Sequence, residues 1–269
     1  MASQTPSASG PIGTNGNNGF YVGYLPAPAT YVRFVRRLVP AMAVLAVVVS
    51  AGVAMMQRDP GTGAWETERI RAFEGVVDAA PYAMIRTVDA NAESGMRTIL
   101  LVREGKFGAV DKVEDVAGRF ARVRGTVLQR DGRMLLELVS GDEGVQTIDA
   151  PTPESLTRLA RPRARSLGRV TLRGEIIDPK CFFGAMKPGE GKLHKECATL
   201  CIAGGIPPML RTSDAAGGAT YHLLVGAGGE AVNDAVLPFV ADPIEITGDL
   251  ERCGDITLLR IDPHDIRRL

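Results

Sequence analysis

The sequence predicts a mainly β protein in which an N-terminal transmembrane helix precedes two small β-barrels in tandem, the second with a short Cys/His-bearing helix. Three observations predict this fold: an uncharged apolar run near the N-terminus, many Gly and Pro residues, and a strand pattern that occurs twice. The 31 Gly and 17 Pro favour turns, and therefore short strands over long helices. A chain of 269 residues is also long enough for two domains of roughly 100 residues each.

The apolar run from Leu38 to Met56 contains 19 residues and no charged side chain. At about 1.5 Å per helical residue, this length crosses a hydrocarbon core about 30 Å thick. Arg33, Arg36 and Arg37 precede the run, so the excess of positive charge lies on its N-terminal side. By the positive-inside rule, residues 1–37 are expected in the cytoplasm, and the chain after the run in the periplasm, of a bacterial inner membrane.

A cleaved signal peptide is the main alternative for this run. Ala51 and Ala54 are small enough for a cleavage site, but the run and the segment before it are both long for a signal peptide. The pair Arg36-Arg37 also allows a twin-arginine export signal, although the residues that follow fit that signal poorly. We therefore expect an uncleaved signal anchor, a single transmembrane helix over residues 38–56.

The segment before the anchor has two parts. Residues 1–19 are mostly Ser, Thr, Gly, Asn and Pro with almost nothing to bury, which predicts disorder. Five aromatic residues then follow within a short stretch: Phe20, Tyr21, Tyr24, Tyr31 and Phe34. Aromatic rings of this kind gather at membrane interfaces, so residues 1–37 are expected to form a disordered cytoplasmic tail with an aromatic juxtamembrane segment. Docking of this segment on a membrane partner is the alternative.

Two segments of the body begin with a strand that contains a glycine. Ala72–Asp78 places Gly75 between apolar and charged residues, and Thr171–Asp178 places Gly174 in a similar pattern. A glycine inside a strand marks a bulge or a sharp bend, and small closed barrels need such bends. The two strands therefore predict two barrels of related plan.

Each of the two segments also closes with a predicted hairpin. Val123–Leu138 turns at Asp131-Gly132, and Ile246–Ile261 follows the same plan with its turn at Cys253-Gly254. An opening strand with a glycine, a middle section and a closing hairpin thus occur twice. Two OB-like barrels in tandem are the expected architecture.

These patterns set the expected domain boundaries. The first OB-like β domain is expected at residues 64–150 and the second at residues 168–269. Residues 151–167 between them are rich in Pro and Arg, which predicts a linker with a short helical piece. All four cysteines lie in the second domain, and the first has Tyr82 where the second has Cys181. The first domain is therefore expected to serve as a spacer or a docking platform.

Three of the four cysteines and one of the three histidines lie within 21 residues of the second domain. Cys181 precedes a predicted helix over residues 192–203. On that helix His194, Cys197 and Cys201 are spaced i, i+3 and i+7, which places them on one face. A loop thiolate that faces these three side chains gives four ligands suited to tetrahedral Zn²⁺.

Copper is the alternative metal for these ligands. Thiolates are soft ligands that suit Cu(I), and Met186 stands nearby as a possible additional ligand. His222, in a later predicted strand, is a second candidate for a ligand or for a residue that supports the ligands. No C-x-x-C-H motif is present in the sequence, so covalently attached c-type haem is not indicated.

The segment that begins with Asp178 carries the patterns D-x-x-C-[FY]-x-G and H-x-x-C-A-x-x-C-[IA]-x-x-G-[IQ]-P. With these patterns it resembles a functionally uncharacterised OB-like module of exported bacterial proteins. The resemblance covers residues 168–265. It carries over the motif positions Cys181, Gly184, His194, Cys197, Ala198, Cys201, Gly205 and Pro207. The resemblance implies an important site without naming its chemistry.

A structural disulfide is the alternative interpretation of the cysteines, because the predicted compartment is oxidising. Cys181 bonded to Cys197 or to Cys201 would join the loop to the helix and contribute about 3 kcal/mol. Cys197 and Cys201 lie on adjacent helical turns and are poorly directed to bond each other. The helical cysteine left over beside His194 would then be a candidate reactive thiol.

The composition argues against nucleic-acid binding, because the formal net charge is zero and only 5% of the residues are aromatic. No nucleophile elbow, P-loop, dinucleotide-binding or metalloprotease motif is present in the sequence, so an enzyme is not favoured. The first hypothesis is a membrane-anchored periplasmic accessory protein with a Cys/His metal site, a subunit or assembly factor of a membrane redox complex. The second is a structural protein-binding module whose cysteines form a disulfide. A thiol oxidoreductase ranks last, because the sequence contains no C-x-x-C motif.

Overall fold

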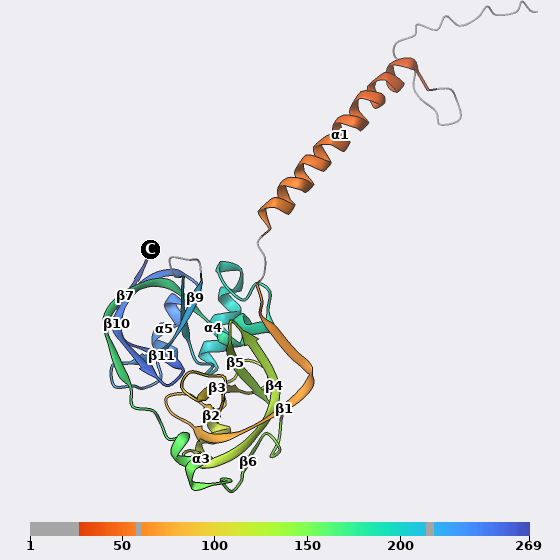
Figure 1. The fold of residues 1–269 in the computed structure, drawn as a ribbon. Helices are drawn as coiled ribbons and strands as arrows, with labels where there is room; N and C mark the ends of the chain where they lie inside the picture. The colour runs from red at the N-terminus through yellow and green to blue at the C-terminus, as the bar shows by residue number, and fades with distance from the viewer. Residues whose placement is uncertain (1–26, 58–60, 214–217) are drawn as a thin grey trace, which may run out of the picture. The chain divides into compact units, whose positions relative to one another are not determined.

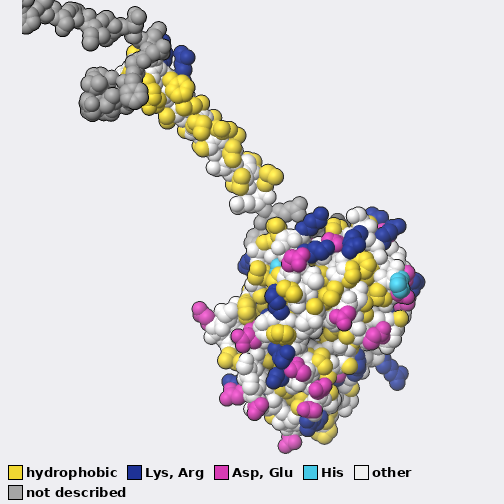
Figure 2. Space-filling view, turned by 180° about the vertical axis from the view of Figure 1, so that it is seen from behind, with side chains coloured by type: hydrophobic (Ala, Val, Ile, Leu, Met, Phe, Trp, Pro, Cys, Tyr) yellow, Lys and Arg dark blue, Asp and Glu magenta, His cyan; other side chains and the backbone are white. Residues whose placement is uncertain are grey.

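The computed structural model describes residues 27–57, 61–213 and 218–269. Helix α1 extends from Ala29 to Met56 (Figure 1). Within the described ranges it is the one helix that is long and apolar enough to cross a membrane. Hydrophobic side chains cover its length in Figure 2.

Helix α1 starts earlier than the predicted span. The sequence predicts a tail up to residue 37, of which residues 1–26 lie outside the described residues. The helix begins at Ala29, directly after Pro28, and no Gly or Pro interrupts the residues up to Leu38. Proline fixes the backbone just before a helix and is tolerated there, which accounts for the start. The end of the helix at Met56 agrees with the predicted end.

The first barrel has five strands that close on themselves. They are β1 (Ala64–Asp78), β2 (Met84–Val88), β3 (Met96–Val102), β4 (Phe120–Arg130) and β5 (Arg133–Leu138). They pair in the order β1-β2-β3-β5-β4, and β4 pairs back with β1. The β3–β5 pair is parallel, because α2 (Val110–Val113), the 3₁₀ turn η1 (Glu114–Val116) and β4 intervene along the chain. The short strand β6 (Val145–Thr147) extends the sheet beside β4.

The second barrel repeats this plan. Its strands are β7 (Arg165–Ile177), β8 (Met209–Ser213), β9 (Ala219–Gly226), β10 (Pro243–Cys253) and β11 (Ile256–Arg268). They close in the order β7-β8-β9-β11-β10, with β9 and β11 parallel. The helical turns α5 (Asn233–Val236) and η4 (Leu237–Phe239) take the place of α2 and η1. The predicted mainly β fold with two OB-like barrels is confirmed.

The segment between the barrels is shorter than predicted. It contains helix α3 (Pro153–Arg158), whose first turn is capped by the Thr152 side chain. Strand β7 already begins at Arg165, inside the predicted linker of residues 151–167. The reason is that β10 is long enough to pair with these residues, as Arg252 does with Arg165.

The glycines inside the strands have a steric explanation. Gly75, Gly125, Gly174 and Gly248 hold equivalent places in the four strands β1, β4, β7 and β10. A Cβ atom added at each would overlap a backbone carbonyl oxygen of the neighbouring strand, that of Arg211 in the case of Gly174. Only glycine allows this close approach, so these residues determine where each barrel bends.

Each barrel has a buried core of its own, and a further buried cluster joins the two. This joining cluster contains Tyr82, Leu100 and Leu135 from the first barrel together with Phe182 and Tyr221 from the second. The Tyr82 hydroxyl donates to the carbonyl of Leu224 at 2.8 Å and accepts from the amide of Val232 at 3.1 Å. Tyr82 therefore extends from the first barrel into the second. A domain that served only as a spacer would not need such buried contacts with its neighbour.

We predict that Gly174→Ala lowers the free energy of unfolding by about 1–3 kcal/mol, because the new methyl group forces β7 away from β8. Urea denaturation of the full chain measures the change. The control is Arg173→Ala on the same strand, where a solvent-screened ion pair with Glu245 contributes little to stability. Equal stability of the two variants would contradict the steric explanation.

Candidate metal centre

The candidate site lies in a long connection between β7 and β8. Residues 178–208 form this connection, whereas residues 79–83 suffice at the equivalent place in the first barrel. It consists of the π-helical turn η2 (Cys181–Ala185), the 3₁₀ turn η3 (Lys192–His194) and helix α4 (Lys195–Ala203). Helix α4 ends at Ala203, directly before the Gly204-Gly205 pair, as the sequence predicts.

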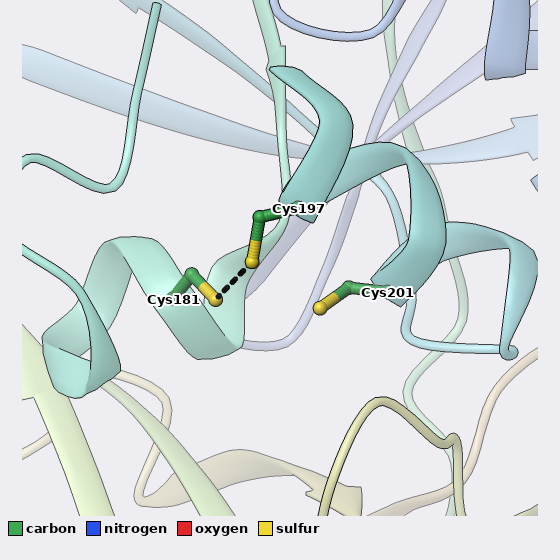
Figure 3. Close-up of side chains that lie close together, drawn as sticks. All are labelled: Cys181, Cys197 and Cys201. Carbon is green, nitrogen blue, oxygen red and sulfur yellow. Dashed lines mark hydrogen bonds between the residues drawn. The ribbon is translucent and has the colours of Figure 1, made fainter. Parts of the chain in front are cut away.

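The turn that carries Cys181 is set by the residues directly before it. The carboxylate Oδ1 of Asp178 accepts the backbone N–H of Lys180 at 2.8 Å, which starts the turn at the end of β7. The carbonyl of Cys181 then accepts the N–H of Met186 and closes the π-helical turn. The Cys181 side chain consequently points toward α4 (Figure 3).

Three thiols converge between η2 and α4. The Sγ atoms of Cys181, Cys197 and Cys201 all lie within 4.8 Å of one another. Those of Cys181 and Cys197 are 3.9 Å apart (Figure 3). Sulfur atoms bound at about 2.3 Å to one tetrahedral Zn²⁺ lie roughly 3.8 Å apart, so this pair already has the spacing that a shared metal ion requires.

His194 is in a second group, together with Cys181 and Asp178. The ligand atoms of these three residues also lie within 4.8 Å of one another. His194 is only 3% exposed and Asp178 is fully buried. Among the described residues, neither His194 Nε2 nor Asp178 Oδ2 has a hydrogen-bond partner. A buried polar atom without a partner is costly, and a bound metal ion would satisfy the imidazole.

Burial sets the protonation of His194. It lowers the pKa of this side chain, and the nearby Lys106 lowers it further, whereas Asp178 acts in the opposite direction. The imidazole is therefore neutral near pH 7, which is the form that binds a metal ion. Sequence reasoning missed Asp178 as a member of the site, although it begins the motif segment.

The first barrel supplies a further group that the sequence did not predict. Lys106, in the loop after β3, places its Nζ 2.8 Å from Cys197 Sγ and 3.7 Å from Cys201 Sγ. The hydrogen bond to Cys197 raises the pKa of Lys106, so the ammonium form is stabilised. For Cys181, contact with the Cys201 thiol and burial both raise the pKa.

Backbone contacts hold the Lys106 loop against the site. Lys180 Nζ donates to the carbonyls of Arg103 at 2.9 Å and Gly105 at 2.6 Å, and it forms a buried ion pair with Glu137. The N–H of Gly108 donates to the carbonyl of Gly204, at the end of α4, at 2.9 Å. The first barrel thus forms one wall of the candidate site.

The remaining predicted residues lie at the edge of the site or outside it. Met186 follows η2 directly, but nearly half of its side chain is exposed. His222 is buried in β9, where its Nδ1 lies 2.9 Å from Thr257 Oγ1, and it belongs to neither group of potential ligands in the described chain. Cys253, predicted in the hairpin turn, is the last residue of β10, and its thiol donates to the carbonyl of Pro162. Of the predicted ligands, Cys181, Cys197 and Cys201 form one group, and His194 lies with Cys181 and Asp178 in the other, so that Cys181 is common to both.

All four cysteines are free thiols in the structure. The alternative disulfide between Cys181 and Cys197 or Cys201 is accordingly not formed. No known protein family, curated protein or solved structure matches this chain. The chemistry of the site is therefore inferred from its own residues.

We predict that Lys180→Met lowers the free energy of unfolding by about 3–5 kcal/mol. The substitution leaves the Glu137 carboxylate without its buried partner and two carbonyls of the Lys106 loop without a donor. Chemical denaturation of the full chain measures the loss. Lys112→Met is the control, because Lys112 is an exposed lysine of the first barrel. A loss no larger than in this control would contradict the assigned role of Lys180.

Proposed function

We propose that this protein is a membrane-anchored metal-binding protein whose ligands are Cys181, Cys197, Cys201 and His194. The observation that carries the proposal is a cluster of three thiols beside a buried imidazole that lacks a hydrogen-bond partner. Three thiolates and one imidazole suit tetrahedral Zn²⁺, and the same soft sulfur ligands suit Cu(I). Asp178 and Lys106 then serve as the charged groups next to the ligands.

The proposed location is the periplasmic side of a bacterial inner membrane. Helix α1 supports a single-span anchor, and the arginines at its N-terminal end support a cytoplasmic N-terminus. The resemblance of residues 168–265 to a module of exported bacterial proteins supports the same orientation. A tethered metal site without a catalytic motif in the sequence fits an accessory subunit or assembly factor of a membrane redox complex.

A structural module with a disulfide is the second candidate. The observation in its favour is the 3.9 Å separation of Cys181 Sγ and Cys197 Sγ, which a small movement would close to bonding distance. In that case the oxidised body would dock a protein partner and hold no metal ion.

We predict that the full chain, purified in detergent without oxygen or chelators, contains one metal ion per chain. Cys197→Ser and His194→Ala should each weaken its binding at least about tenfold, because each removes a ligand. Elemental analysis and a count of free thiols on the same sample measure both quantities. Cys253→Ser is the matched control and should retain the metal, since Cys253 lies outside the cluster.

Two outcomes would contradict the metal proposal. One is an unchanged metal content in both ligand variants. The other is a metal-free wild-type protein with a Cys181–Cys197 disulfide, which would support the structural module instead. Thermal unfolding of each variant without metal shows whether the variant is folded. Added Zn²⁺ should then raise the unfolding temperature of the wild type, because a ligand that binds only the folded state stabilises that state.

A further inference from the structure

The three clustered thiols differ in their access to solvent. Cys181 is 5% exposed and Cys201 is 1% exposed, whereas Cys197 is half-buried. Cys197 is therefore the member of the cluster that an oxidant from solution reaches most readily. The Nζ of Lys106 lies against the sulfur of the same residue.

The Lys106 nitrogen, which becomes a nucleophile once it loses a proton, is also closer to that sulfur than the Cys181 thiol is. Its Nζ is 2.8 Å from Cys197 Sγ, whereas the Sγ of Cys181 is 3.9 Å away. Two further contacts hold Lys106 beside this sulfur. Lys106 Nζ lies 3.4 Å from the carbonyl oxygen of Cys197, and the hydrogen bond from the Gly108 N–H to the Gly204 carbonyl anchors the loop that carries Lys106. An oxidised Cys197 would thus meet an amine before it meets another thiol.

We propose that Lys106 and Cys197 form a covalent sulfur–nitrogen cross-link when the metal-free protein reacts with a peroxide. The Cys197 thiolate attacks hydrogen peroxide, so that an S–O bond forms, the O–O bond breaks and hydroxide leaves. The hydroxide takes one proton from the Lys106 ammonium group and becomes water. The amine then attacks the sulfenic sulfur, the S–N bond forms, the S–O bond breaks, and the second water leaves with another proton from the nitrogen.

The electrons of this sequence balance. Sulfur loses two electrons and one peroxide molecule gains two, so that ammonium, thiolate and peroxide yield a sulfenamide and two water molecules. The cross-link joins the loop after β3 in the first barrel to helix α4 in the second. It also removes Cys197 as a thiolate ligand. The inference depends on the geometry without metal, so it holds whether or not the proposed metal function is correct.

We predict that stoichiometric hydrogen peroxide converts the reduced, chelator-treated full chain to a form in which Lys106 is bonded to Cys197. Proteolysis and mass spectrometry should find one linked peptide pair that contains both residues and lacks two hydrogens. Dithiothreitol should separate the pair, because thiols reverse sulfenamides. The product should be absent from Cys197→Ser and from Lys106→Arg, and present in the matched control Lys112→Arg.

Two results would overturn the inference. One is a disulfide between Cys197 and another cysteine in the wild type, with Lys106 unmodified. The other is direct conversion of Cys197 to sulfinic acid at the same rate in the wild type and in Lys106→Arg, which would show that the amine does not trap the oxidised sulfur. Circular dichroism of each variant before oxidation establishes that the fold is retained, and metal content measured separately on reduced protein keeps this test independent of the proposed function.

Discussion

At the junction of the two barrels, the ammonium group of Lys180 is buried and bonded entirely to the first barrel. Lys180 directly precedes Cys181, so the same contacts fix the backbone of one thiol and the loop that carries Lys106. A buried charge is tolerated only when it is paired and hydrogen-bonded, and the two carbonyls with the Glu137 carboxylate meet this condition. One charged group thereby aligns the sulfur atoms of one barrel with the amine of the other.

Much of the fold could be predicted because its signals are local. Gly174 inside a strand predicted a bend, and the bend exists because the neighbouring strand passes too close for a side chain. Asp131-Gly132 predicted a two-residue hairpin turn, and both residues adopt the positive φ that this turn requires. The helical spacing of Cys197 and Cys201 likewise predicted that their thiols share a face, and both converge with Cys181.

The features that were missed depend on contacts between distant parts of the chain. Lys106 and Cys197 are separated by 91 positions and meet because two barrels pack together, which no spacing rule reveals. Asp178 begins the motif segment, but its place in the site does not follow from spacing, since only burial shows that its second oxygen lacks a partner. The early start of α1 does not follow from apolarity, because the helix continues through the charged residues Arg33, Arg36 and Arg37 before the apolar run.

The buried cluster that joins the two barrels determines what a cut between them would expose. Separation of the barrels would expose the apolar surface around Tyr221 and leave the Leu224 carbonyl and the Val232 amide without the Tyr82 hydroxyl. Each barrel keeps a core cluster of its own, so fragments cut between the barrels would each retain an interior. They would, however, present the apolar surface of the joining cluster to water, which makes such fragments prone to aggregate.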